Sequence, residues 1–279
     1  MRDADVAGVQ RLSVATFEDL ARRRGETPPP PPDPELAAVR LRRLLTTDPG
    51  GCWVADDADG GLAGAALAIV REGLWGLSLF IVRPDRQSEG LGGRLLRRAL
   101  AHGDGWEAGI ILASPDPRAL RTYRRAGFDL HPTVKAAGVP AGVAAAPEVR
   151  PFAPEDTAMA DEVGRQVRGA AYGDDLAALA AGGCELLAHP GRGFLATRAG
   201  RLILLVAADE AAAAALLRTM FARAGAGAAV EVEWLTERQG WALDVALDAG
   251  LELQLGHGAL FVRGDPGPLA PYVPSGAYL

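Results

Sequence analysis

The sequence predicts an α/β fold that occurs twice along the chain, and three features carry this prediction. Residues 52–55, 62–70 and 74–82 are apolar, partly β-branched segments separated by turn residues, which is typical of successive strands. A glycine-rich turn at residues 87–93 leads directly into a segment with apolar side chains at helical spacing. The order of strand and helix patterns then begins again at residue 148.

The N-terminal segment predicts two helices joined by a stiff connection. Residues 5–24 and 34–46 carry apolar side chains at helical spacing. Between them, residues 28–32 are five consecutive prolines, which have no backbone N–H donor and hold an extended conformation. Residues 48–51 then predict the turn that precedes the first strand.

The segment after the glycine-rich turn predicts a strand, a helix and another strand. Residues 109–113 are apolar enough for a short buried strand, and residues 117–126 predict a helix that ends at Gly127. Residues 128–133 predict the next strand. Residues 134–147 are rich in alanine, glycine and proline, and we interpret them as partly strand and partly linker.

The repeat divides the chain into two predicted domains, residues 1–140 and 147–279. The second copy is not chemically equivalent to the first. Two acidic residues and a run of alanines (209–215) stand where the first copy has its glycine-rich turn, and Ala246 stands where the first copy has Tyr123. Because alanine side chains crowd the backbone and carboxylates repel a phosphate, we expect one competent site and one structural copy.

Composition and charge exclude several classes of function. The chain has 279 residues, of which 49% are hydrophobic, and its net charge is −6. This acidic balance argues against nucleic acid or an anionic membrane as the main partner. Residues 1–25 are charged throughout, unlike a signal peptide, and no apolar run is long enough to span a bilayer. The spacing of Cys52 and Cys184 suggests neither a metal site nor a disulfide, so we expect a cytoplasmic protein without a metal.

The glycine-rich turn has the geometry of an anion site. A turn that opens a helix presents unpaired backbone N–H groups and the positive end of the helix dipole, which together bind a pyrophosphate. The alternative is a simple turn between a strand and a helix. The residues that we expect to hold the pyrophosphate are Gln87, Ser88, Glu89, Gly90, Leu91, Gly92 and Gly93.

Two motifs together resemble the GNAT superfamily of acetyl-CoA-dependent N-acetyltransferases. The first, residues 82–92, is a strand end followed by Gln-x-x-Gly-x-Gly. The second, residues 116–128, resembles the family's Asn-x-x-Ala-x-x-x-Tyr-x-x-x-Gly-Phe, with Asp116 in place of the usual asparagine. The resemblance covers most of residues 1–135, where the family's first strand is missing or rudimentary. The whole chain resembles a tandem GNAT protein, in which each copy is a mixed, mostly antiparallel sheet flanked by helices.

The resemblance implies a co-substrate and roles for individual residues. Acetyl-CoA is the expected acetyl donor, and Phe80, Ile81 and Val82 are expected to lie along its pantetheine arm, where the strand splays from its neighbour at a bulge. Tyr123 is expected to act as the general acid that protonates the departing CoA thiolate. The alternative for these four side chains is ordinary core packing.

The general base and the acceptor stay open at this stage. Glu72, Asp56, Asp57 and a water relay are candidates for the base, and His131 is a candidate for lining the acceptor pocket. The proline segment lies where the family builds its acceptor wall. We expect a small-molecule amine as acceptor. A protein N-terminus or lysine, and a non-catalytic acyl-CoA-binding module, are the alternatives. The chain is expected to be a monomer with an internal pseudo-dimer, or a homodimer.

Overall fold

The structure, a computed structural model, describes residues 1–28, 30–103 and 105–278. Its helices are α1 (Val6–Arg24), α2 (Pro34–Thr47), α3 (Leu91–Leu100), α4 (Pro117–Arg125), α5 (Thr157–Arg168), α6 (Asp175–Ala181), α7 (Glu210–Arg223) and α8 (Gly240–Asp248). The strands of the first half are β1 (Cys52–Asp56), β2 (Leu62–Arg71), β3 (Leu74–Val82), β4 (Ala108–Ala113) and β5 (Asp129–Gly138). The later strands are β6 (Arg150–Pro151), β7 (Glu185–His189), β8 (Gly193–Arg198), β9 (Arg201–Ala207), β10 (Val230–Leu235), β11 (Glu252–Arg263) and β12 (Tyr272–Val273).

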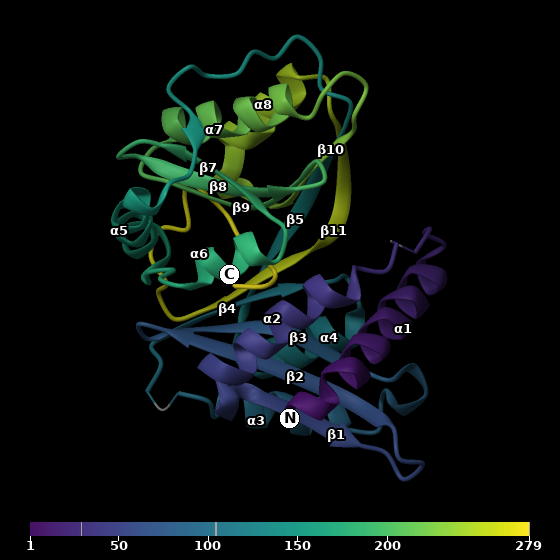
Figure 1. Ribbon diagram of the computed structural model, residues 1–279. Helices are drawn as coiled ribbons and strands as arrows, with labels where there is room; N and C mark the ends of the chain where they lie inside the picture. Colours follow the sequence, from purple (N-terminus) through teal and green to yellow (C-terminus); the bar gives the residue numbers. More distant parts are fainter. Residues whose placement is uncertain (29, 104, 279) are drawn as a thin grey trace.

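The strands of the described residues form one continuous sheet that runs through both halves of the molecule (Figure 1). Its order is β1-β2-β3-β4-β11-β5-β10-β9-β8-β7-β6, and β12 pairs with β9. Most neighbours are antiparallel, whereas β3 with β4 and β9 with β10 are parallel. The predicted α/β class with a mixed, mostly antiparallel sheet is therefore confirmed.

The two halves exchange long strands. β11 leaves the second half and lies between β4 and β5 of the first half, with Leu260 opposite Leu112 on β4 and His131 on β5. The far end of β5 in turn pairs with β10, where Val232 lies opposite Ala136. Figure 1 shows both strands crossing between the halves. Because each half-sheet contains a strand from the other, a cut between residues 140 and 147 would leave both incomplete, and the two-domain division stays a prediction.

Helices cover both faces of each half-sheet. In the first half, Leu12 of α1 and Leu41 of α2 pack with Ile81 on one face of β3. On the other face, Leu96 of α3 and Tyr123 of α4 pack in a separate apolar cluster. α5 and α6 extend the first of these clusters into the second half, and α7 and α8 cover the opposite face there. One apolar layer therefore runs unbroken beneath both halves.

β1 is an edge strand in the part of the chain that the structure describes. It pairs with β2, and the N-terminal amine of Met1 donates a hydrogen bond of 3.0 Å to the carbonyl of Cys52. The second half differs, because the short strand β6 adds to β7 at the equivalent edge. Among the described residues, no strand from elsewhere covers β1, and no helix is both long and apolar enough to cross a bilayer.

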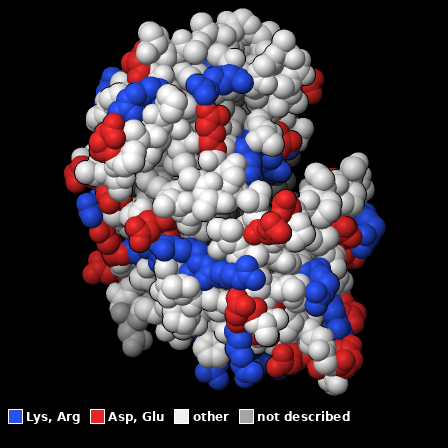
Figure 2. Space-filling view, in the orientation of Figure 1, with Lys and Arg blue, Asp and Glu red and all other residues white. Residues whose placement is uncertain are grey.

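An ion-pair network joins the halves beside α2. The carboxylate of Asp175 is fully buried and accepts hydrogen bonds from Arg71 at 2.6 Å and from Arg43 at 3.3 Å. Arg71 also donates to Asp48 at 2.9 Å. In Figure 2, basic side chains gather on this face at the level of α2, where the two halves meet. These bonds fix α2 and the β2–β3 turn against the second half.

Candidate active site

The glycine-rich turn is exposed and leads into α3 without a side-chain cap. Gly90 adopts a φ of +80° and is the residue before the first helical turn. Among the described residues no side chain caps the first amides of α3. The side-chain amide of Gln87 is not available to an anion, because its Nε2 already donates a hydrogen bond of 2.9 Å to the carbonyl of Val82. The backbone geometry is therefore suited to a pyrophosphate, with Gln87 holding the turn onto the strand end.

β3 diverges from β4 beside this turn. Their parallel pairing ends at Leu77 and Ile111. At the same point the register with β2 shifts, so that Leu67 faces Leu79, Ala68 faces Leu77, and Ser78 is the bulged residue between them. The backbone of β3 beyond Ser78 is thus not bonded to β4. A bulge with diverging strands is the feature that the resemblance implies for a pantetheine arm.

The three predicted strand residues are distributed over both faces of β3. Ile81 is 2% exposed and belongs to the core beneath α1 and α2. Phe80 and Val82 face α3 and α4, and Phe80 lines a large cavity. Binding of the pantetheine arm by this stretch stays a prediction, in which the backbone rather than the side chain of Ile81 would take part.

Tyr123 lies in the same cavity as Phe80. Its ring contacts Phe80, with centroids 5.8 Å apart, and Phe261 of β11 at 5.3 Å with an interplanar angle of 69°. Its hydroxyl makes no hydrogen bond within the described part of the chain, and burial, followed by the charge of Asp116, raises the pKa of the phenol. A proton therefore stays on Tyr123 at neutral pH. Asp116 itself caps α4 by accepting from the amide of Arg118 at 2.9 Å.

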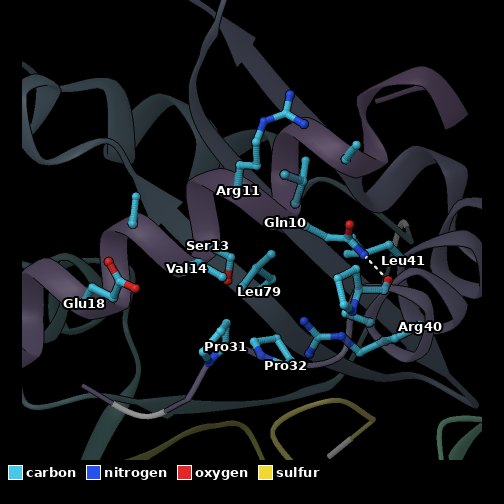
Figure 3. A pocket seen from close by; sticks show the side chains of 15 residues that line it. Gln10, Arg11, Ser13, Val14, Glu18, Pro31, Pro32, Arg40, Leu41 and Leu79 are labelled. Carbon is cyan, nitrogen blue, oxygen red and sulfur yellow. Dashed lines mark hydrogen bonds between the residues drawn. The ribbon is translucent and has the colours of Figure 1, made fainter. Parts of the chain in front are cut away.

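The cavity, of about 940 Å³, lies between the two halves. The end of α1, the proline segment, the diverging ends of β3 and β4, and α4 line it from the first half. β9, β10, the bulged part of β11 and Gly276 of the tail line it from the second. A second, more apolar cavity of about 550 Å³ adjoins it beneath α1 and α2, and Ser13, Arg40 and Leu79 line both (Figure 3).

A cluster of charged side chains forms the second-half wall of the larger cavity. Lys135 lies 2.8 Å from Glu231, and Arg201 lies 2.9 Å from Glu233. His257 lies 3.4 Å from Glu233. Burial lowers the pKa of His257 below its ordinary value, while Glu233 acts in the opposite direction. The imidazole is therefore held neutral, as a proton acceptor must be.

The side chains that the sequence suggested for the base, Glu72, Asp56 and Asp57, do not line this cavity, and neither does His131, the candidate for the acceptor pocket. Glu72 accepts from Arg165 at 2.9 Å and from the amide of Ala171 at the junction of the halves. Asp57 binds Arg86 at 2.9 Å, and His131 lies 3.5 Å from Glu237. Within the described ranges, no group of histidine, cysteine and carboxylate side chains is placed to hold a metal ion.

His257, Glu233 and Lys135 do not stand out in the sequence as site residues. One signal was available: in Val230-Glu231-Val232-Glu233 the valines alternate with carboxylates, so both glutamates share the face opposite the core. The proximity of the three side chains could not be predicted from the sequence, because β5, β10 and β11 meet only through the strand exchange.

In the second half the equivalent slot is filled by the chain itself. β9 and β10 also diverge, after Arg201 and Glu231, but β12 of the C-terminal tail pairs with β9 there. The amide of Ala207 donates to the carbonyl of Pro271 at 3.2 Å. At the start of α7, Asp209 caps the helix by accepting from the amide of Ala212 at 3.0 Å. The strand edge that a pantetheine arm would need and the helix amides that a pyrophosphate would need are therefore both occupied.

Comparisons with known proteins agree with this architecture. Residues 14–128 match the model of the acetyltransferase (GNAT) family. A structure from Pyrococcus horikoshii described as a candidate acetyltransferase aligns over 100% of this chain and 94% of its own, with a TM-score of 0.79 and 18% identity. A GCN5-related N-acetyltransferase from Sphaerobacter thermophilus aligns over 96% and 95%, with a TM-score of 0.58 and 17% identity. No curated protein matches the chain.

A tandem GNAT protein from the clavulanic acid biosynthesis pathway also aligns, over 96% of this chain and 98% of its own, with a TM-score of 0.57 and 16% identity. At such identities these likenesses concern the fold. The family match covers the half that carries the glycine-rich turn and Tyr123, and the likeness to solved structures extends over both halves. Residues 14–128 therefore carry the GNAT acetyltransferase domain, and the chain as a whole has the fold of a tandem GNAT protein.

Proposed function

We propose that this protein transfers an acetyl group from acetyl-CoA to the amine of a small molecule. The observation that carries the proposal is the divergence of β3 from β4 at Ser78, beside the uncapped start of α3 and in the same cavity as Tyr123. The pyrophosphate would bind the amides of the glycine-rich turn, and the pantetheine arm would run along β3 into the cavity.

The proposed chemistry is direct transfer. The neutral amine attacks the thioester carbonyl and the C–N bond forms. The nitrogen, which is cationic after attack, gives a proton to solvent, and collapse of the tetrahedral intermediate breaks the C–S bond. Tyr123 gives its proton to the departing CoA thiolate and regains one from solvent. The raised pKa of Tyr123 keeps that proton in place until the sulfur develops charge. His257, paired with Glu233, is the group in this cavity that we propose to accept the ammonium proton, directly or through a water.

The lining of the cavity supports a small molecule as acceptor. The proline segment and the end of α1 wall it on one side, and strands of the second half wall it on the other. Each glutamate that lines the larger cavity already has a cationic partner, so the wall is not an open acidic groove of the kind that suits a basic peptide. A protein amine is the alternative acceptor. Cys52 and Cys184 are free and buried, which supports a reducing compartment such as the cytoplasm.

The test is a panel of small amines and a lysine-containing peptide, with acetyl-CoA as donor and release of free CoA thiol as the signal. In Tyr123→Phe we expect kcat to fall by about 10²- to 10⁴-fold, the usual contribution of a general acid, with the KM for acetyl-CoA nearly unchanged. Because the phenylalanine ring keeps the contacts with Phe80 and Phe261, folding should be preserved. Full activity of Tyr123→Phe would remove the acid role, and preferred use of the peptide would favour a protein acceptor.

A further inference from the structure

Arg40 is the point at which the two cavities meet. It lies on α2, and Figure 3 shows its side chain reaching toward Pro32 and Leu79, whereas Arg11 points away from the proline segment. The guanidinium makes one hydrogen bond, from Nη1 to the carbonyl of Ser78 at 3.4 Å. In the described part of the chain no carboxylate lies within 4.0 Å of it, so its positive charge has no partner of opposite sign.

The other cations that line the larger cavity are all paired. Arg24 lies 2.7 Å from Glu26. Lys135 and Arg201 are paired with the glutamates of β10. Among the described residues, these three ion pairs use every carboxylate of the lining and leave Arg40 as the unbalanced charge. The cavity therefore carries an excess positive charge at a defined place.

The other arginines near Arg40 on α2 are paired with carboxylates. Arg42 pairs with Asp3 at 3.1 Å on the surface, and Arg43 pairs with the buried Asp175 at 3.3 Å. Burial lowers the pKa of Arg40, and the neighbouring Tyr278 acts in the opposite direction. An arginine held in a cleft without a carboxylate is costly unless a ligand supplies the anion. Its planar fork of donors fits a carboxylate or a phosphate in two-point fashion.

We propose that Arg40 binds an oxyanion, a carboxylate or a phosphate, that is part of the acetyl acceptor. The acceptor is then an amine that bears an anionic group, an inference that rests on the proposed function. Ser78, whose carbonyl Arg40 contacts, is the bulge along which the acyl arm is proposed to run. An amine only a few bonds from the oxyanion can reach the thioester there. The adjoining cavity is lined by apolar groups such as Val9, Val14 and Leu41, so it suits an apolar substituent of the same molecule.

The experiment begins with acetyl-CoA binding by calorimetry to the wild type, Arg40→Met, Arg40→Lys and the surface control Arg42→Gln. All four are expected to bind acetyl-CoA with similar affinity, because Arg40 lies outside the glycine-rich turn. Thiol release is then measured with alanine, leucine and phenylalanine, each compared with its amide, its phosphonate analogue and the amine that lacks the anionic group. Within each set the side chain stays the same and the group beside the amine changes.

In the wild type, we expect kcat/KM for the oxyanion-bearing members to exceed that of the matched neutral amines by at least about tenfold, a difference typical of one charged contact. Arg40→Met should lose this preference, so that its kcat/KM for the oxyanion-bearing members falls to that for the matched neutral amines. Arg40→Lys should retain part of it, and Arg42→Gln all of it. The carboxylate and phosphonate arms show which oxyanion is preferred. Arg40→Met should also melt no earlier than the wild type, since no carboxylate partner is left behind.

Equal use of neutral and anionic amines by the wild type overturns the proposal, as does a preference that survives in Arg40→Met. A wild-type protein that binds acetyl-CoA but neither acetylates nor binds any oxyanion-bearing member overturns it as well. A large loss of thermal stability in Arg40→Met would indicate a structural role instead. Failure to bind acetyl-CoA at all would refute the proposed function itself, and is thereby distinguished from the failure of this proposal.

Discussion

Phe261 offers a test of how the second half of the chain positions Tyr123. Its side chain is fully buried on β11, and its ring lies edge-on to that of Tyr123, with centroids 5.3 Å apart. Replacing Phe261 by alanine would leave a cavity costing about 3–5 kcal/mol, a large share of the stability of a typical domain. Phe261→Leu is the milder change, and we expect it to cost about 1–2 kcal/mol through the lost ring contact and altered packing.

The functional effect of Phe261→Leu should exceed what the stability loss explains. Without the ring beside it, Tyr123 can tilt, and a misplacement of about 1 Å of a catalytic group costs up to about 100-fold in rate. We expect kcat to fall by about tenfold or more, with the KM for acetyl-CoA little changed. The assays are urea unfolding and thiol release with the preferred amine of the panel.

Phe194→Leu is the matched control. Phe194 is equally buried, and its ring contacts Tyr172 and Phe152 in the second half, where it does not touch the cavity. A similar loss of stability with unchanged kcat is expected there. If Phe261→Leu also kept full kcat, the inference that β11 positions Tyr123 would be refuted.

Two further predictions concern the proton acceptor and the glycine-rich turn. Because burial lowers the pKa of His257, kcat/KM should fall in acid with a midpoint below 6.5, the ordinary pKa of histidine. Glu233→Gln should move that midpoint lower still, because the charge of Glu233 raises the pKa of His257. A pH–rate profile with a midpoint above 6.5 contradicts this prediction. Gly90→Ala should weaken acetyl-CoA binding, since Gly90 adopts a φ of +80° at the start of α3. Gly60→Ala, at a φ of +85° in open space, should cost a similar amount of stability, about 1 kcal/mol, and leave binding intact, as calorimetry would show.

Local signals in the sequence predicted much of the first half. The apolar strand pattern that stops two residues before Pro84, and the glycines that follow, predict β3, the turn and α3 close to where the structure has them. Gly127, with a φ of +87°, lies directly after the end of α4 as predicted. These features depend on neighbours in the chain, and backbone preferences of proline and glycine are strong enough to decide them.

Pairing between distant segments could not be predicted in the same way. The composition of residues 134–147 favours a partial linker, yet residues 134–138 continue β5 and pair with β10 and β11. Their side chains carry little periodic signal, and the strand exists because two other strands flank it. The cluster of Lys135, Glu233 and His257 depends on this pairing, so it was missed, whereas Tyr123 could be found from a motif in a single helix.

The C-terminal tail is a second case of tertiary context. Several of its residues are apolar, and the structure places Tyr272 and Val273 in the slot between β9 and β10. The sequence of the second copy predicted the loss of its phosphate turn, through Asp209 and the alanines that follow. That sequence did not indicate that the C-terminal tail fills the slot between β9 and β10.

The number of acetyl-CoA molecules bound per chain separates a protein with one acyl-CoA site from a protein with two such sites or none. The first half presents an uncapped glycine-rich turn and an open divergence of β3 from β4, whereas in the second half Asp209 caps the helix and β12 fills the slot. Calorimetric titration of the intact chain with acetyl-CoA should therefore give one site per chain, and Gly90→Ala should weaken that site. Absence of binding, or two sites of similar affinity, would contradict a single acyl-CoA site in the first half.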